Sequence, residues 1–150
     1  MKGQTLIEVL LALSIAAVVI TSVTILAISS LSNAQYIKNQ DLATKYGQDG
    51  METVLKIRNS SYTGFSTYNG LYCLGKGQTV LGSAKPSCTV ANVDNFIRSV
   101  QIQQNGSCGA NLAQVAIVVS WTDSKCQSGT YCHTSQISSC FSTVNPVTAP

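Results

Sequence analysis

The sequence predicts an α+β fold in which one long N-terminal helix packs, through its outer half, on a small antiparallel β-sheet. Three observations predict it. The N-terminal part of the chain is an apolar run without proline or internal glycine, two segments after residue 95 alternate between apolar and polar residues, and six cysteines follow the apolar run. Long apolar runs favour a helix, whereas alternation favours half-buried strands.

The apolar run is long enough to cross a membrane. No charged residue lies between Glu8 and Lys38, and the polar residues between them are mainly serine and threonine. A hydrocarbon core of about 30 Å needs roughly 20 apolar residues in a helix. The positive charge at Lys2 is expected to stay on the cytoplasmic side, which places the C-terminal part outside. We therefore assign residues 4–31 to a single transmembrane part of the helix, in a bacterial cytoplasmic membrane.

The helix is expected to continue beyond the membrane, with residues 32–58 as its outer half. Apolar and small residues recur there at helical spacing; they are Ala43, Tyr46, Gly47, Gly50, Met51, Val54 and Leu55. This stripe should pack on the globular part, and the two glycines would permit close backbone approach. The alternative is that the glycines break the helix.

Residues 59–150 are assigned to a globular β domain. Its first part, residues 59–95, is rich in glycine and serine and is expected to be an irregular, variable connection. Residues 144–150 are expected to form a loose tail.

Two strands are predicted within this domain, at residues 96–102 and 115–121. In the second, Val115, Ile117, Val119 and Trp121 alternate with other residues, so Trp121 is expected to be a core residue. The turn-forming loop between the strands predicts an antiparallel hairpin. A weaker third strand is expected near residues 133–141, with His133 on its surface.

The six cysteines indicate a disulfide framework in an oxidising compartment, because their number is even and they follow an export segment. They are Cys73, Cys88, Cys108, Cys126, Cys132 and Cys140. The sequence does not choose among the pairings. Cys126, Cys132, His133 and Cys140 are an alternative zinc site, but they lack the Cys-x-x-Cys spacing typical of structural sites. Disulfides are favoured, and no metal or cofactor is expected.

Catalysis and nucleic-acid binding are not expected. The chain has one histidine, no Gly-x-Ser-x-Gly elbow and no glycine-rich phosphate loop. The acids after Glu8 are dispersed and are expected to be solvated; they are Asp41, Asp49, Glu52, Asp94 and Asp123. The net charge of +3 comes from scattered lysines and arginines, without a basic run.

Glu8 is the most informative residue, because a carboxylate at the edge of an apolar span is costly without a partner. Residues 3–13, which read GQTLIEVLLAL, closely resemble the N-terminal signal of type IV prepilins and pseudopilins. The resemblance implies that residues 1–3 are a leader peptide, that a prepilin peptidase cleaves between Gly3 and Gln4, and that the new terminus is N-methylated. It also implies that Glu8 pairs with the amine of Gln4 in a neighbouring subunit during assembly. Without that resemblance, Glu8 could equally face water or headgroups at the membrane interface.

This sequence departs from the family pattern at two points. The leader is shorter than most, and the first mature residue is Gln4, where many members have phenylalanine. An N-terminal glutamine can cyclise, which would remove the positive charge that Glu8 needs, whereas methylation would oppose cyclisation. Mass spectrometry of the mature N-terminus distinguishes the two forms.

The rest of the chain resembles the family less specifically. Asp49-Gly50-Met51-Glu52 and the strand ending at Trp121 are similar to minor pseudopilins of type II secretion-like systems, and favour a minor or I-like pseudopilin. The partners implied are other pilin or pseudopilin subunits, the prepilin peptidase, an assembly platform membrane protein and membrane lipid. The alternatives are an anchored, disulfide-rich binding module that forms no fibre, and a small secreted enzyme or inhibitor released by ordinary signal peptidase.

Overall fold

The computed structural model describes residues 4–143, with side chains from Leu6 onward. These residues belong to two compact units, one ending at Lys38 and the other starting at Asn39. The expected leader, residues 1–3, and the expected tail, residues 144–150, lie outside the described residues.

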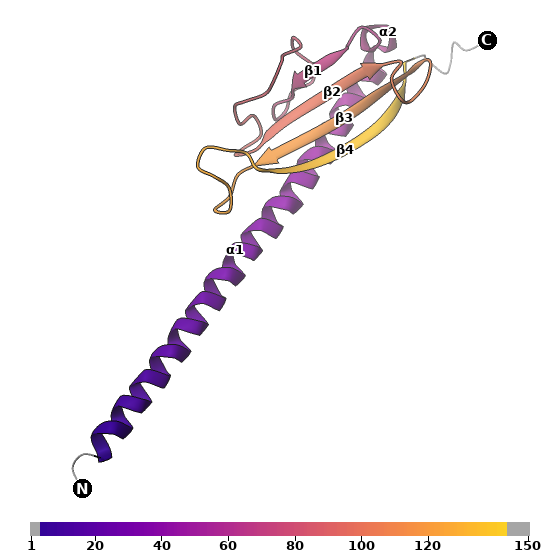
Figure 1. Ribbon diagram of the computed structural model, residues 1–150. Coiled ribbons are helices and arrows are strands. Elements are labelled where there is room, and N and C mark those ends of the chain that lie inside the picture. Colours follow the sequence, from indigo (N-terminus) through magenta and orange to yellow (C-terminus); the bar gives the residue numbers. More distant parts are fainter. Residues whose placement is uncertain (1–3, 144–150) are drawn as a thin grey trace. The chain divides into compact units, whose positions relative to one another are not determined.

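Helix α1 spans Gln4–Ser60 (Figure 1). Its 57 residues correspond to about 85 Å at 1.5 Å per residue. The helix passes through Gly47 and Gly50 without interruption, so the alternative of a break at the glycines is wrong. The predicted end near Arg58 is confirmed to within two residues.

A four-stranded antiparallel sheet follows, with the strand order β1-β2-β3-β4. The strands are β1 (Gly70–Cys73), β2 (Ile97–Gln104), β3 (Leu112–Trp121) and β4 (His133–Ser142). The predicted hairpin is formed by β2 and β3, in which Val100 lies opposite Ile117. Asn105 and Asn111 adopt positive φ angles in the loop between these strands, a conformation that asparagine tolerates better than most residues. The third predicted strand is confirmed as β4.

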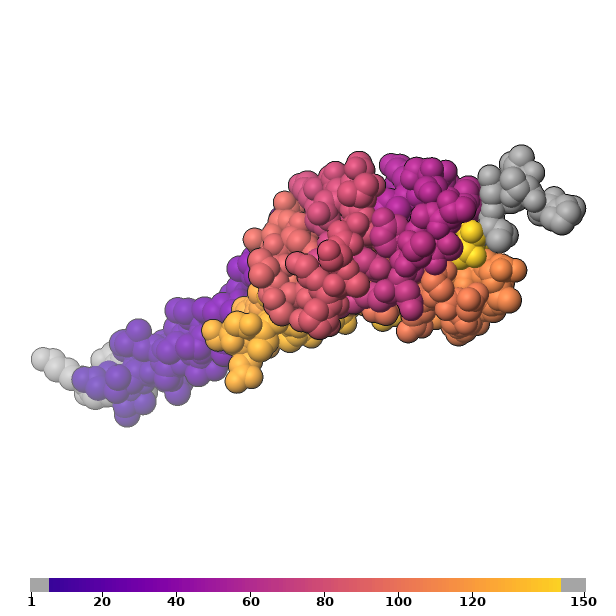
Figure 2. Space-filling model, turned by 90° about the horizontal axis from the view of Figure 1, so that it is seen from above, coloured from indigo at the N-terminus to yellow at the C-terminus, as the bar shows by residue number. Residues whose placement is uncertain are grey.

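The expectation of an entirely irregular segment over residues 59–95 is wrong. Helix α2 (Tyr62–Phe65) and strand β1 both lie in it. Ser61 caps α2 by accepting a hydrogen bond from the Gly64 amide at 3.0 Å. These elements are too short for a periodic pattern in sequence, and β1 forms because its edge pairs with β2. Between β1 and β2 the chain is otherwise irregular, and its rose-coloured residues form a broad part of the surface visible in Figure 2.

The core lies between the outer half of α1 and one face of the sheet. The side chains of β3 alternate between buried and half-buried, as predicted, and Trp121 is 2% exposed. From α1 the core receives Ala43, Val54 and Ile57. The aromatic rings of Phe96 and Trp121 are tilted against each other, with their centroids 6.2 Å apart.

All six cysteines form disulfides, as the sequence predicts. Cys73–Cys88 ties β1 to the segment that follows it, Cys108–Cys140 ties the β2–β3 loop to β4, and Cys126–Cys132 closes the β3–β4 loop. Their sequence separations are 15, 32 and 6 residues. Because cross-links over longer loops restrict the unfolded chain more, Cys108–Cys140 should stabilise the fold most.

Candidate assembly site

The N-terminal half of α1 presents apolar side chains on all sides. Every residue from Leu6 to Leu31 is exposed, and the exposed fractions of the large apolar side chains in this range lie between 54% and 69%. The helix is long and apolar enough to cross a membrane. A helix that is apolar all round requires lipid or other helices around it, because water solvates such a surface poorly.

Glu8 lies within the first turns of this helix and is exposed. Within the described residues no ion pair joins Glu8 to another part of the chain. Gln4 is the first residue of α1, but its side chain lies outside the described set, as does Gly3 altogether. In apolar surroundings the charge of Glu8 would therefore need a partner from outside the described residues.

The outer half of α1 approaches the sheet at its two glycines. A Cβ atom on Gly47 would lie 3.0 Å from Cδ1 of Ile137 on β4. A Cβ atom on Gly50 would lie 3.1 Å from Cδ of Arg98 and 3.1 Å from Cδ1 of Ile117. These distances are shorter than ordinary van der Waals contacts, so the glycines permit the close approach that the sequence predicts.

Arg98 on β2 joins the helix to the sheet and to the β1–β2 segment. Its side chain is 1% exposed, and its Nη1 donates to Oδ2 of Asp49 at 2.6 Å and to the carbonyl of Tyr46 at 3.0 Å. Nε donates to the carbonyl of Leu74 at 3.0 Å, and Nη2 donates to the carbonyl of Gly75 at 2.8 Å. A buried guanidinium is tolerated only when its donors are largely satisfied, and these four bonds occupy four of its five N–H groups.

Sequence reasoning missed Arg98, although a signal for it was present. Arg98 alternates in step with Val100 and Ile102 of β2 and with Phe96 just before it, all of which are buried. A charged residue on the apolar face of a strand indicates a buried ion pair. Its partner Asp49 was expected to be solvated; its side chain is 58% exposed, yet it accepts the bond from Arg98.

A second polar contact links α1 to the chain before β2. The hydroxyl of Tyr46 donates to Oδ2 of Asp94 at 2.6 Å, and Nζ of Lys76 lies 3.3 Å from Oδ1 of the same carboxylate. The bond from Tyr46 and then that from Lys76 lower the pKa of Asp94. The bond to Asp94 raises the pKa of the Tyr46 hydroxyl. Asp94 itself has a positive φ of 51°.

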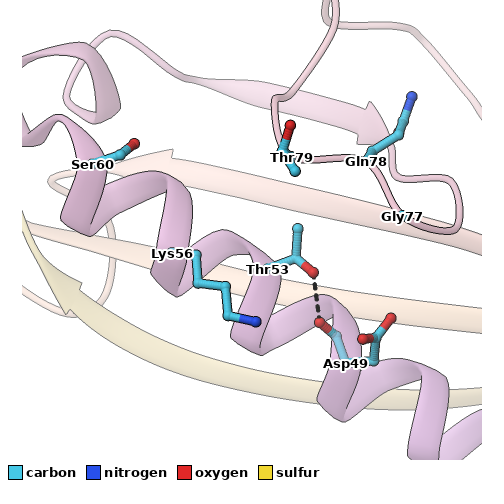
Figure 3. A pocket seen from close by; sticks show the side chains of 7 residues that line it. All are labelled: Asp49, Thr53, Lys56, Ser60, Gly77, Gln78 and Thr79. Carbon is cyan, nitrogen blue, oxygen red and sulfur yellow. Dashed lines mark hydrogen bonds between the residues drawn. The ribbon is translucent and has the colours of Figure 1, made fainter.

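A shallow polar pocket lies between the outer half of α1 and the β1–β2 segment (Figure 3). It has a volume of about 390 Å³. The helix contributes Asp49, Thr53, Lys56 and Ser60, and the facing segment contributes Gly77, Gln78 and Thr79. The hydroxyl of Thr53 donates to the backbone carbonyl of Asp49 at 2.8 Å. The lining of hydroxyl, amide and charged groups suits a polar ligand or a polar side chain of a partner.

The β3–β4 loop brings together three of the four residues of the alternative zinc site, namely Cys126, Cys132 and His133. Cys126 and Cys132 are bonded to each other and lie beside His133, whereas Cys140 is bonded to Cys108 and does not belong to this group. The expectation that His133 lies on the strand surface needs correction, because its side chain is only 21% exposed and its ring centroid lies 5.4 Å from that of Trp121.

His133 also contacts Asp123, with 3.1 Å between Nε2 and Oδ1. Burial raises the pKa of Asp123, but the hydrogen bonds from the Lys125 amide and from His133 outweigh it, so the pKa is lowered overall. The remaining acids, Asp41 and Glu52, are exposed on α1, as expected.

Comparisons of the chain with protein-family models, with curated proteins and with solved structures found no match.

Proposed function

We propose that this chain is a minor pilin or pseudopilin, a structural and non-catalytic subunit of a type IV pilus or of a type II secretion pseudopilus. In this proposal the prepilin peptidase cleaves the chain after Gly3, and the subunit assembles through its N-terminal helix. The observation that carries the proposal is the position of Glu8 at the start of a helix that is apolar and exposed on every side.

In this proposal the charge of Glu8, rather than the apolar surface, makes assembly specific. When the helix moves from lipid into a fibre of similar helices, apolar contacts replace apolar contacts, so the gain per contact is small. A carboxylate at the centre of a membrane costs about 2.5–3.5 kcal/mol or more. The amine of Gln4, released by cleavage in a neighbouring subunit, would compensate that charge and would fix the register between the two helices.

The folded unit supports the same proposal. Its helix is continuous with the apolar helix, and three disulfides stabilise a domain that would lie outside the cytoplasm. Arg98 and the close contacts at Gly47 and Gly50 hold that helix on the sheet. A pull on the helix would therefore be transmitted to the folded unit.

Processing is tested by co-expression with a prepilin peptidase. Mass spectrometry of the purified chain should then find a mature N-terminus at Gln4, with a charged, methylated amine. A Gly3→Asp substitution, which alters only the cleavage site, should leave the chain unprocessed but still inserted in the membrane. Retention of Met1 in the wild-type chain, or loss of the whole apolar segment, would contradict the proposal.

Assembly is tested with Glu8→Ala and, as a matched control, Glu52→Ala on the exposed face of the outer half. Glu8→Ala should reduce incorporation into fibres at least tenfold without changing cleavage or membrane insertion. Glu52→Ala should incorporate normally. Incorporation is measured by immunoblotting of sheared fibres, and equal incorporation of the two variants would exclude a role for Glu8 in assembly.

The second candidate is a membrane-anchored, disulfide-rich binding module that forms no fibre. The polar pocket between α1 and residues 77–79 favours it. The two candidates differ at the N-terminus, because a plain anchor keeps Met1 and tolerates Glu8→Ala. The same processing and assembly experiments therefore decide between them.

A further inference from the structure

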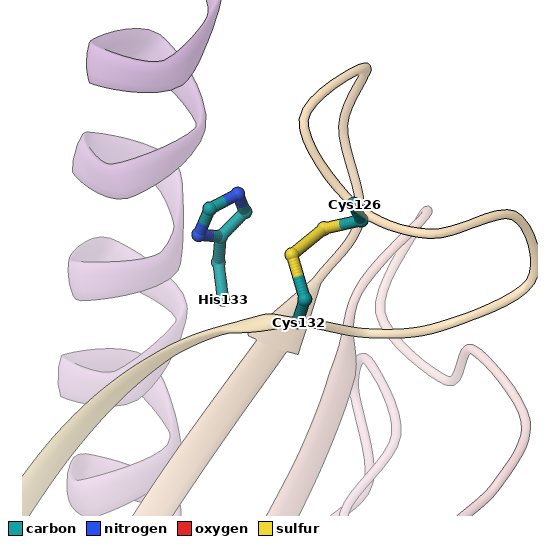
Figure 4. Close-up of side chains that lie close together, drawn as sticks. All are labelled: Cys126, Cys132 and His133. Carbon is teal, nitrogen blue, oxygen red and sulfur yellow. A yellow bond between two sulfur atoms is a disulfide. The ribbon is translucent and has the colours of Figure 1, made fainter.

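The Cys126–Cys132 disulfide has a histidine beside it. Both Sγ atoms and one imidazole nitrogen of His133 lie within 4.8 Å of one another (Figure 4). The disulfide closes a loop with a sequence separation of only 6 residues, and the Cα atoms are 5.6 Å apart. His133 follows Cys132 directly as the first residue of β4, so the ladder with β3 fixes its backbone. The three groups thus converge from one short loop and one strand end.

Of the three disulfides, it is Cys126–Cys132 that has the histidine beside it. His133 is the only histidine in the chain, so Cys73–Cys88 and Cys108–Cys140 have no imidazole to complement their sulfurs. Within the part of the chain that the structure describes, Cys126, Cys132 and His133 are the one group of this kind. Thiolate and imidazole are ligands that zinc and similar ions prefer.

A carboxylate also contacts the imidazole. Oδ1 of Asp123 lies 3.1 Å from Nε2 of His133, and the Asp123 side chain is 6% exposed. The amide of Lys125 donates to the same oxygen at 2.8 Å and holds the carboxylate in place. Metal-binding histidines commonly have a carboxylate as the partner of their second nitrogen, which orients the ring.

We propose that reduction of the Cys126–Cys132 disulfide converts this cluster into a binding site for a zinc-like divalent ion. Cys126 and Cys132 supply two thiolates, His133 supplies one nitrogen, and Asp123 positions the imidazole. Zinc–sulfur bonds of about 2.3 Å in a tetrahedron place two sulfurs about 3.8 Å apart. The Cα separation of 5.6 Å accommodates this by side-chain rotation. The fourth position of the ion is left to water.

The chemistry balances with a phosphine as the reductant. The sulfur–sulfur bond breaks and accepts two electrons from phosphorus. Water gives its oxygen to the phosphine oxide and its two protons to the sulfurs. The ion then displaces both thiol protons into solvent. The disulfide and the bound ion exclude each other, so the cluster is closed in its oxidised form and binds metal only in its reduced form.

The test uses the full chain in detergent micelles, reduced with a phosphine until mass mapping finds Cys126 and Cys132 free. Zn²⁺ binding is followed by competition with a chelating dye, and Co²⁺ serves as a spectroscopic probe of thiolate ligation. The reduced chain should bind one ion and show a thiolate-to-cobalt band, whereas the oxidised chain should bind none. Fluorescence of Trp121, whose ring lies 5.4 Å from His133, should change on binding.

Three variants locate the site. C126S/C132S keeps the other disulfides and should bind no ion after the same reduction. His133→Gln and Asp123→Asn should each weaken binding about 10- to 100-fold, whereas Gln127→Ala in the same loop should bind as the wild type does. If C126S/C132S binds as much Zn²⁺ as the wild type, or if no thiolate band appears, the proposal is overturned.

A variant that needs no reductant covers the case in which reduction unfolds the chain. C132S leaves Cys126 and His133 in place with the other two disulfides intact. It should bind Co²⁺ weakly through one thiolate, and C132S/H133Q should lose that band. Absence of the band in C132S also overturns the proposal. None of these outcomes depends on fibre assembly, so they are independent of the proposed function.

Discussion

The two halves of α1 share one backbone but differ in what surrounds them. In the half that ends at Lys38, every side chain from Leu6 to Leu31 is exposed. The hydroxyls of Ser14, Thr21, Ser22 and Thr24 donate hydrogen bonds to backbone carbonyls of the helix itself. In the half that starts at Asn39, Ala43 and Val54 are fully buried against the sheet. The same helix is thus exposed on every side from Leu6 to Leu31 and is part of a core in its second half.

Because of this difference, substitutions in the two halves should affect different properties of the protein. Substitutions in the first half should alter membrane insertion and assembly without changing the stability of the folded unit. Substitutions on the buried stripe of the second half should do the reverse. Trp121 reports unfolding of the folded unit, because it is the only tryptophan and lies in the core.

The largest effect on stability is expected from Arg98→Ala. The substitution leaves the carbonyls of Tyr46, Leu74 and Gly75 without their donor and removes a buried ion-pair partner of Asp49. A buried acceptor left without a donor costs about 1–3 kcal/mol, whereas water can solvate the Asp49 carboxylate, whose side chain is 58% exposed. Urea unfolding of the full chain in micelles, followed by Trp121 fluorescence, measures the loss. Lys45→Ala, at an exposed position of the same helix, is the control, and a loss of less than about 1 kcal/mol for Arg98→Ala would show that the network is dispensable.

The next largest loss of stability is expected from a substitution at Gly50, and its control lies in the exposed half of the helix. Gly50→Leu places a side chain where Arg98 and Ile117 already lie within 3.1 Å of a Cβ position. Overpacking of this kind costs about 1–3 kcal/mol. The matched control is Ala27→Leu in the exposed half, which should leave urea unfolding unchanged. Equal effects of the two substitutions would contradict the distinction between the halves.

The sequence predicts what depends on long, regular patterns. The extent of α1, the β2–β3 hairpin, the burial of Trp121 and the pairing of all six cysteines among themselves follow from apolar runs, alternation and an even cysteine count. Helix α2 and strand β1 are four residues long each, too short for any period to show. They depend on contacts with residues far away in the sequence.

The polar contacts were not predictable for the same reason. Arg98 bonds to Asp49 and Asp94 bonds to Tyr46 across sequence separations of 49 and 48 residues. Which partner each dispersed acid meets depends on the path of the folded chain. Arg98 alternates in step with the buried Val100 and Ile102, and this overlooked pattern is sufficient to expect a buried partner without naming it.

Acid should weaken the folded unit through Asp94 and Asp123. The pKa of both carboxyls is lowered from the ordinary value of 3.8, so folding favours their ionised forms. Their stabilising contribution is present above pH 3.8 and is lost as the pH falls through the lowered values. Urea midpoints measured across this range should fall with pH, and Asp94→Asn should flatten part of that fall. Asp41→Asn, at an exposed position of α1, should leave the profile unchanged.

The smallest effect is expected from Lys76→Ala, which isolates the two partners of Asp94. The side chains of Lys76 and Asp94 are 69% and 50% exposed and lie 3.3 Å apart, so water and salt screen their attraction. Tyr46 reaches the same carboxylate at 2.6 Å from a ring that packs edge-on against Phe96. Lys76→Ala should therefore leave the urea midpoint unchanged at physiological salt, whereas Tyr46→Phe should lower it measurably at neutral pH. If Lys76→Ala had the larger effect, the contact that holds the outer half of α1 would be an ion pair of the β1–β2 segment rather than a hydrogen bond from the helix.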